Sequence, residues 1–153
     1  MNFDIRRDNL SGADVQALVQ EHINEMLSNT PIESVHTLPL DSLRKPEVTF
    51  WSVWHQGELS GCGALMELDS THGEIKSMRT KAKFLRMGVG HAILSRIISE
   101  ANLRGCTRIS LETGSTEAFK PALTLYEQNG FEVCGPFGDY KNDPNSIFMT
   151  KIL

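Results

Sequence analysis

Apolar residues recur at helical spacing in two long stretches of the chain. The first follows the start signal Ser11–Asp14 and ends near Ser28–Pro31, and the second runs from Val89 to Leu103. Residues three or four positions apart share one face of a helix, so both stretches are predicted to be amphipathic helices. Pro121–Asn129, followed by Gly130, predicts a further helix. The apolar positions are Val15, Leu18, Val19, Ile23, Met26 and Leu27 in the first stretch, and Val89, Ile93, Leu94, Ile97, Ile98 and Ala101 in the second.

Short runs rich in β-branched and aromatic residues predict the strands. The predicted strands are Phe3–Arg6, Val48–His55, Leu59–Leu68, Gly73–Thr80, Arg108–Thr113, Phe131–Val133 and Ile147–Leu153. Tight turns between the early strands favour an antiparallel meander, whereas the long helix before Arg108 favours a parallel pair. The sum is an α/β fold with a mixed central sheet of about seven strands, flanked by about four helices.

Two long loops interrupt this pattern. Ile32–Pro46 contains a candidate helical turn at Asp41–Arg44, and Gly135–Ser146 separates the last two predicted strands. Long loops inside a compact domain usually have a functional role, so both loops are expected to border a site.

The segment Phe84–His91 carries the clearest chemical signal. Gly88 and Gly90 allow a tight turn directly before a helix start, where free N–H groups and the helix dipole favour an anion. A dinucleotide-binding fingerprint needs a third glycine at the place of Ile93, and a P-loop needs a lysine at the place of His91. Both known nucleotide loops are therefore excluded, and a different anionic ligand is expected.

Composition narrows the classes of function. With 153 residues, 40% of them apolar and 22% charged, the chain suits a single globular domain over residues 1–153. A net charge of −4 argues against nucleic-acid binding, and the lack of a long apolar run argues against a membrane protein. The N-terminal segment has no apolar core typical of a secretion signal, so the protein is expected to be cytoplasmic.

The cysteines and histidines show no metal-ligand spacing. Cys62, Cys106 and Cys134 are odd in number, which favours reduced thiols over a structural disulfide. The five histidines are scattered along the sequence. No metal site is expected.

The order of these features resembles the GNAT superfamily of acetyl-coenzyme A-dependent N-acetyltransferases, and within it a small uncharacterised bacterial subgroup. The resemblance rests on the strand that bears Glu74, the loop Leu85–Gly90 and the block Leu125–Phe131, and it covers essentially the whole chain. The family loop usually starts with Gln or Arg where this chain has Leu85, which puts that side-chain contact in doubt but leaves the backbone amides. The resemblance implies that acetyl-coenzyme A is the acyl donor.

The resemblance also implies a V-shaped opening between the two central parallel strands, where the pantetheine arm binds. A β-bulge commonly creates such a splay. The apolar positions change parity between Ile75 and Met78, which fits either an extra residue or a strand buried on both sides. The residues implied in binding acetyl-coenzyme A are Ser77, Met78, Arg79, Thr80, Leu85, Arg86, Met87, Gly88, Val89, Gly90 and His91.

Three groups are implied in the chemistry. Glu74 matches a position that often carries the general base, although a lone glutamate on a strand is more often a solvated side chain. The backbone N–H near Met78 is the expected oxyanion donor, and Tyr126 matches a tyrosine that protonates the thiolate, although it can also be a core aromatic.

The acceptor is expected to bind between the two long loops. Glu33, His36, Asp139 and Tyr140 are the candidate acceptor-binding residues. The leading hypothesis is direct acetyl transfer to a primary amine of a small molecule, such as an amino acid or a polyamine. Acetylation of a protein N-terminus or lysine, and a non-catalytic acyl-coenzyme A-binding module, are the alternatives. A homodimer is expected by analogy only.

Overall fold

The computed structural model describes residues 2–153, and its elements follow the predicted order. The strands are β1 (Asp4–Arg7), β2 (Val48–His55), β3 (Glu58–Glu67), β4 (His72–Thr80), β5 (Arg108–Gly114), β6 (Glu132–Cys134) and β7 (Ser146–Ile152). The helices are α1 (Ala13–Asn29), α2 (Leu40–Leu43), α3 (Val89–Leu103) and α4 (Lys120–Gln128), with 3-10 turns at Ile32–Ser34, Ala82–Phe84 and Glu117–Phe119. Most predicted boundaries are correct to within two residues, and α3 matches at both ends. No helix among the described residues is long and apolar enough to cross a membrane.

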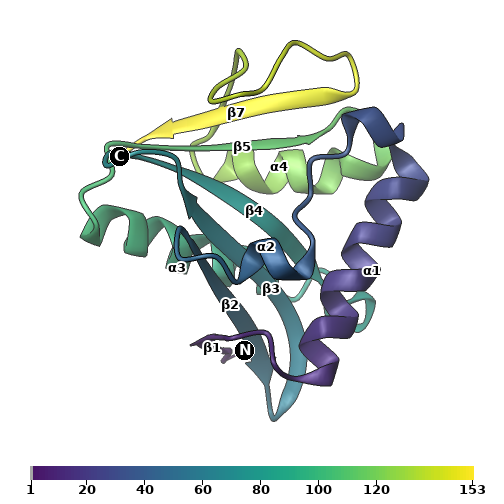
Figure 1. The fold of residues 1–153 in the computed structure, drawn as a ribbon. Coiled ribbons are helices and arrows are strands. Elements are labelled where there is room, and N and C mark those ends of the chain that lie inside the picture. Colours follow the sequence, from purple (N-terminus) through teal and green to yellow (C-terminus); the bar gives the residue numbers. More distant parts are fainter. Residues whose placement is uncertain (1) are drawn as a thin grey trace.

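The seven strands form one mixed sheet in the order β1-β2-β3-β4-β5-β7-β6 (Figure 1). The pair β4 and β5 is parallel, and every other pair of neighbours is antiparallel. The long connection through α3 makes the parallel pairing possible, because parallel neighbours need a crossover. The predicted α/β sheet with an antiparallel N-terminal part is confirmed.

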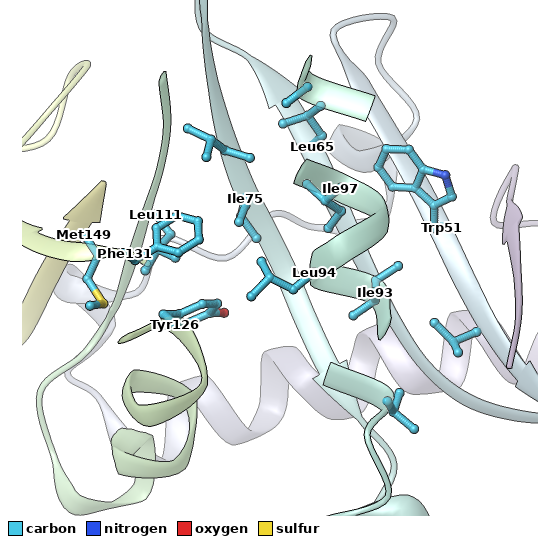
Figure 2. Packing of buried hydrophobic residues seen from close by; sticks show 14 of the residues in the cluster. Trp51, Leu65, Ile75, Ile93, Leu94, Ile97, Leu111, Tyr126, Phe131 and Met149 are labelled. Carbon is cyan, nitrogen blue, oxygen red and sulfur yellow. The ribbon is translucent and has the colours of Figure 1, made fainter. Parts of the chain in front are cut away.

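Two apolar cores cover the two faces of the sheet. Ile93, Leu94 and Ile97 of α3 pack against the sheet in the larger core, and Figure 2 shows them beside Trp51 and Leu65. Burying such large aliphatic side chains contributes roughly 2 kcal/mol each. The other core contains Val15, Leu18 and Val19 of α1 together with Leu43 of α2, Phe50 and Leu59. The alternation along β2, with Phe50 in one core and Trp51 in the other, is the period expected of a strand buried on both sides.

The central parallel strands are paired at one end and separate at the other. The ladder runs from His72 opposite Arg108 to Ile75 opposite Leu111 and ends there, although β4 continues to Thr80 and β5 to Gly114. Hydrogen bonds between side chains link three strands at the paired end. They join His72 Nε2 to Ser110 Oγ at 2.7 Å, and Ser110 Oγ to Thr150 Oγ1 at 2.9 Å. The opening that the resemblance implied is therefore present in the fold.

A β-bulge in β4 accompanies this separation. Cys62 of β3 lies opposite Arg79 and Ala64 lies opposite Lys76, so β4 has one more residue than β3 over this interval. Ser77 in the bulge has a φ of 56°, a conformation that non-glycine residues rarely adopt. The change of parity between Ile75 and Met78 thus comes from an inserted residue.

Candidate functional site

A cavity of about 790 Å³ lies where β4 and β5 separate. It extends from the N-terminus of α3, along the free end of β4, to the loop after α1. In Figure 2, Ile75 on β4 and Leu111 on β5, the last paired residues of these strands, lie above Tyr126 of α4. One continuous cavity therefore contacts both the glycine loop and residues 34–37 of the first long loop, whereas no residue of the second long loop lines it.

The glycine loop forms the first end of the cavity. Gly88 has a φ of 89° and caps α3, which starts at Val89. The N–H groups of residues 86–91 donate no backbone hydrogen bond within residues 2–153, so they remain available to a ligand. A Cβ at Gly90 would lie 2.9 Å from Leu125 Cδ2, so α3 and α4 approach closely here because position 90 is glycine. This arrangement of free N–H groups at a helix start suits phosphate oxygens.

The free edge of β4 forms the middle of the cavity. Ser77, Met78, Arg79 and Thr80 line it and have no pairing partner on β5. Backbone amides at such an edge can bind an extended ligand as a neighbouring strand would. The chain therefore presents a place for an amide-containing arm that continues from a phosphate group.

Tyr126 projects into the cavity from α4. The residue is 6% exposed, its ring meets Phe131 edge-on at 5.8 Å, and its hydroxyl makes no hydrogen bond to any described residue. Figure 2 shows the hydroxyl pointing away from Met149 and toward the side of Leu94. Burial raises the pKa of Tyr126 well above its usual range, so the phenol keeps its proton at neutral pH.

Glu74 lies in a buried network outside the cavity lining. Its side chain is 2% exposed, and its Oε2 accepts hydrogen bonds from Lys76 Nζ at 3.1 Å and from the Tyr140 hydroxyl at 2.5 Å. Lys76 Nζ also donates to the Tyr140 hydroxyl at 2.9 Å and to the His36 carbonyl at 3.1 Å. All three N–H donors of Lys76 therefore have acceptors. The Lys76 cation balances the charge of the buried Glu74 carboxylate.

The two long loops contact each other next to the end of the cavity that residues 34–37 line. Ser34 Oγ donates to Asp143 Oδ2 at 2.5 Å, Asn145 Nδ2 donates to Ser34 Oγ at 3.4 Å, and the His36 ring meets Tyr140 edge-on at 5.0 Å. We call these contacts the loop roof. They join segments that are more than one hundred residues apart in the chain, and Ser34 and His36 among them line the cavity.

The four candidate acceptor-binding residues lie in different surroundings, and only His36 and Tyr140 take part in the loop roof. His36 lines the cavity, and Tyr140 belongs to the network with Glu74 and Lys76. Glu33 and Asp139 are exposed and do not line the cavity.

Glu112 is a carboxylate that lines the cavity and that sequence reasoning missed. It lies on β5 immediately after Leu111, the last residue paired with β4, and burial raises its pKa above the usual glutamate value. A hint was available in the sequence, because a charged residue in the middle of a buried strand needs an explanation.

Unpartnered polar atoms gather around the same cavity. Among the described residues, five buried side-chain polar atoms lack a hydrogen-bond partner, and four of them belong to residues that line it. These four are His22 Nδ1, Thr37 Oγ1, Ser77 Oγ and Arg79 Nε. Buried polar groups are rarely left unpaired, so this clustering indicates a polar ligand. Residues 2–153 contain no cluster of three or more His, Cys, Asp or Glu side chains placed to hold a metal ion.

His22 makes folding stability depend on pH. Burial, with a smaller effect of the nearby Arg79 cation, lowers the pKa of His22 from 6.5 to about 4. The unfolded chain therefore takes up a proton below pH 6.5 that the folded chain does not bind until about pH 4, so stability falls as pH decreases through this window. We expect up to about 3 kcal/mol to be lost in this way.

Urea unfolding of His22→Gln at pH 7, 5 and 4 measures this effect. The variant should lose less stability on acidification than the parent protein, whereas His91→Gln, at an exposed position, should follow the parent. Parallel losses in all three proteins would contradict the assignment.

Comparison with known proteins identifies relatives of the whole chain. The family model for the acetyltransferase (GNAT) family matches residues 15–131. The chain is 57% identical to the uncharacterised N-acetyltransferase YsnE of Bacillus subtilis, covering 97% of this chain and 99% of YsnE. It is 48% identical to the uncharacterised N-acetyltransferase YedL of Escherichia coli, covering 99% and 95%, and 35% identical to IAA acetyltransferase of Azospirillum brasilense, covering 99% of both.

Solved structures show the same fold. A Klebsiella pneumoniae protein described as an acyl-CoA N-acyltransferase superposes with a TM-score of 0.80 at 26% identity, covering 99% of this chain and 97% of that one. A GNAT acetyltransferase from Elizabethkingia anophelis, with acetyl-CoA bound, superposes with a TM-score of 0.69 at 19% identity, covering 99% of both chains.

Proposed function

Since this chain belongs to the GNAT family of acetyl-CoA-dependent N-acetyltransferases, we propose that it transfers the acetyl group directly to a primary amine of a small molecule. The observation that carries the proposal is the single cavity that joins the free N–H groups of residues 86–91 to Tyr126 and Glu112. This single space supports the assignment of an anion-binding end, a reaction centre and an acceptor end to one site.

The residues at this cavity fit acetyl-CoA. The N–H groups of residues 86–91 would bind the diphosphate, and Arg86 adds a positive charge beside them. The backbone of residues 77–80, which is unpaired on the side of β5, would bind the amide groups of the pantetheine arm. When bound, acetyl-CoA supplies the acetyl group as a thioester.

Three groups of the chain are placed to act on the reacting atoms. The neutral amine nitrogen forms the new C–N bond with the acetyl carbon, and Glu112 accepts the proton that the nitrogen loses in this step. The Met78 N–H stabilises the charge that develops on the carbonyl oxygen. Tyr126 donates its proton to the sulfur as the C–S bond breaks, which suits a phenol that remains protonated. We assign the base to Glu112 in place of Glu74, because Glu112 faces the cavity whereas Glu74 is bonded to Lys76 and Tyr140.

The loop roof supports a small acceptor over a protein acceptor. Hydrogen bonds between Ser34 and Asp143, and between Lys76 and Tyr140, hold both long loops across the acceptor end. An extended polypeptide needs an open groove, whereas an amino acid or polyamine fits beneath the roof. A cytoplasmic location and a homodimer stay predictions.

Release of free thiol from acetyl-CoA across a panel of acceptors tests this function. The panel contains amino acids, polyamines, IAA and short peptides with free N-termini. We expect thiol release to require a small primary amine, and mass spectrometry should find the acetylated amine. Turnover confined to the peptides would support a protein acceptor, and acetyl-CoA binding without turnover on any acceptor would support a non-catalytic module.

The glycine at position 88 allows a matched test of the acetyl-CoA end. Gly88 and Gly105 have φ values of 89° and 83°, and a Cβ at either position meets no atom closer than 4.0 Å. Alanine at each position therefore costs a similar conformational strain of about 1 kcal/mol. Only Gly88→Ala places a methyl group in the phosphate-binding loop.

We expect Gly88→Ala to weaken acetyl-CoA binding about tenfold in calorimetry, as one lost phosphate contact would. Gly105→Ala should bind normally, although both variants should lose similar thermal stability. Equal affinity of the two variants would remove the glycine loop from the binding site.

A further inference from the structure

The thiol of Cys62 contacts the bulge of β4 from the neighbouring strand β3. Cys62 lies on β3, is 1% exposed, and its Sγ donates a hydrogen bond to the Ser77 carbonyl oxygen at 3.3 Å. Burial raises the pKa of this thiol to about 12, so the sulfur keeps its proton at neutral pH and remains a donor.

The Ser77 carbonyl and the Met78 N–H belong to the same peptide group. No cis peptide bond occurs in residues 2–153, so this peptide is trans and its C=O and N–H point in opposite directions. Because the carbonyl points to the Cys62 thiol on β3, the N–H points away from that thiol, and the other edge of β4 is open here because the ladder with β5 has ended. The bond from Cys62 thus fixes the direction of the N–H that is proposed to stabilise the oxyanion.

This peptide needs such a support because it lies in the bulge. The regular register between β3 and β4 is interrupted from Lys76 to Arg79, and Ser77 has a positive φ. The side chain of Met78 is held on the other face of the sheet, since a Cβ at Gly63 would lie only 2.7 Å from Met78 Sδ. In the bulge, two specific contacts therefore take the place of regular β-ladder pairing. The Cys62 thiol bonds the Ser77 carbonyl, and the Met78 side chain packs against Gly63.

We propose that Cys62 is a positioning residue for acetyl transfer, whose thiol orients the Ser77–Met78 peptide so that the Met78 N–H points at the thioester carbonyl oxygen. This inference rests on the proposed function of that N–H. Cys62 does not touch the reacting atoms, and it acts only through the peptide group that it holds.

Infrared difference spectroscopy of acetyl-CoA labelled with ¹³C at the carbonyl measures this role directly. A hydrogen bond to the thioester oxygen lowers the carbonyl stretching frequency, so the bound parent protein should show a downshift from free acetyl-CoA. Cys62→Ala should show a smaller downshift and about a fivefold lower kcat, because one weak orienting bond is lost, while its affinity for acetyl-CoA stays unchanged. Cys62→Ser keeps a donor and should restore most of the downshift and of kcat.

The control is Cys106→Ala, which removes another buried thiol from the larger core. It should lose stability without a change in the carbonyl band. An unchanged band and kcat in Cys62→Ala would overturn the proposal, as would a serine variant that folds and binds acetyl-CoA but behaves like the alanine variant. If Cys62→Ala does not fold, Cys62→Val, which also lacks a donor but fills more of the buried volume, takes its place in the same comparison. A parent protein that binds acetyl-CoA without any downshift would instead refute the oxyanion role of Met78, which is a failure of the proposed mechanism.

Discussion

Replacing Tyr126 by phenylalanine is expected to lower kcat by about two orders of magnitude, which is typical for loss of a general acid. The ring stays in its place against Phe131, so the core and the acetyl-CoA site should remain intact. Without the phenolic proton, the sulfur has to leave as an unprotonated thiolate or take its proton from water. Stopped-flow measurement of thiol release under saturating acetyl-CoA and amine gives kcat, and calorimetry gives the affinity for acetyl-CoA.

Tyr140→Phe is the matched control, because the chain has two tyrosines. The Tyr140 hydroxyl bonds Lys76 and Glu74, so its loss should reduce thermal stability and leave kcat within about threefold of the parent. If Tyr126→Phe retains the parental kcat, Tyr126 is a core aromatic and the proton for the sulfur has another source.

The second large effect concerns the two glutamates of the central strands. Glu112→Gln should lower kcat/KM for the amine by about 10²-fold, because the amide cannot accept the proton. Glu112 works as a base only when it is ionised, and burial raises its pKa. The activity of the parent protein should therefore rise with pH through a pKa above the usual glutamate value. The variant should not show this rise in its pH–activity profile.

Glu74→Gln should act on folding instead. It leaves the buried Lys76 cation without a counter-charge, a change that costs about 3 kcal/mol or more and should lower Tm by roughly 10 °C. At temperatures where both variants are folded, Glu74→Gln should keep most of its kcat/KM. The reverse pattern, with Glu74→Gln stable but inactive and Glu112→Gln fully active, would show that Glu74 is the general base.

Local patterns in the sequence were sufficient to predict the fold and the position of the glycine loop before α3. The four-residue steps from Val89 to Ala101 define the buried face of α3, and all four positions of that series are buried. The glycine loop is equally local, since Gly88, Val89 and Gly90 are neighbours in the chain. Such features depend on residues that are close together in the chain, so their spacing in the sequence is enough to recognise them.

The acceptor end depends on contacts between distant segments, which no local pattern displays. Tyr140 lies 66 positions after Glu74, and only the folded loop brings its hydroxyl to that carboxylate. The same holds for Ser34 and Asp143, which are 109 positions apart. A glutamate on a strand therefore looked like a free base until the tertiary structure showed what surrounds it, and the cavity-facing Glu112 was overlooked.

Hydrogen bonds from His72 to Ser110 and from Ser110 to Thr150 link β4, β5 and β7 at the end where β4 and β5 are paired. Because these bonds and the inserted residue in β4 belong to the chain itself, the separation of β4 from β5 is part of the fold. If the donor binds there as proposed, no free energy is needed to separate the strands, and more of the binding interaction is available to align the reacting atoms.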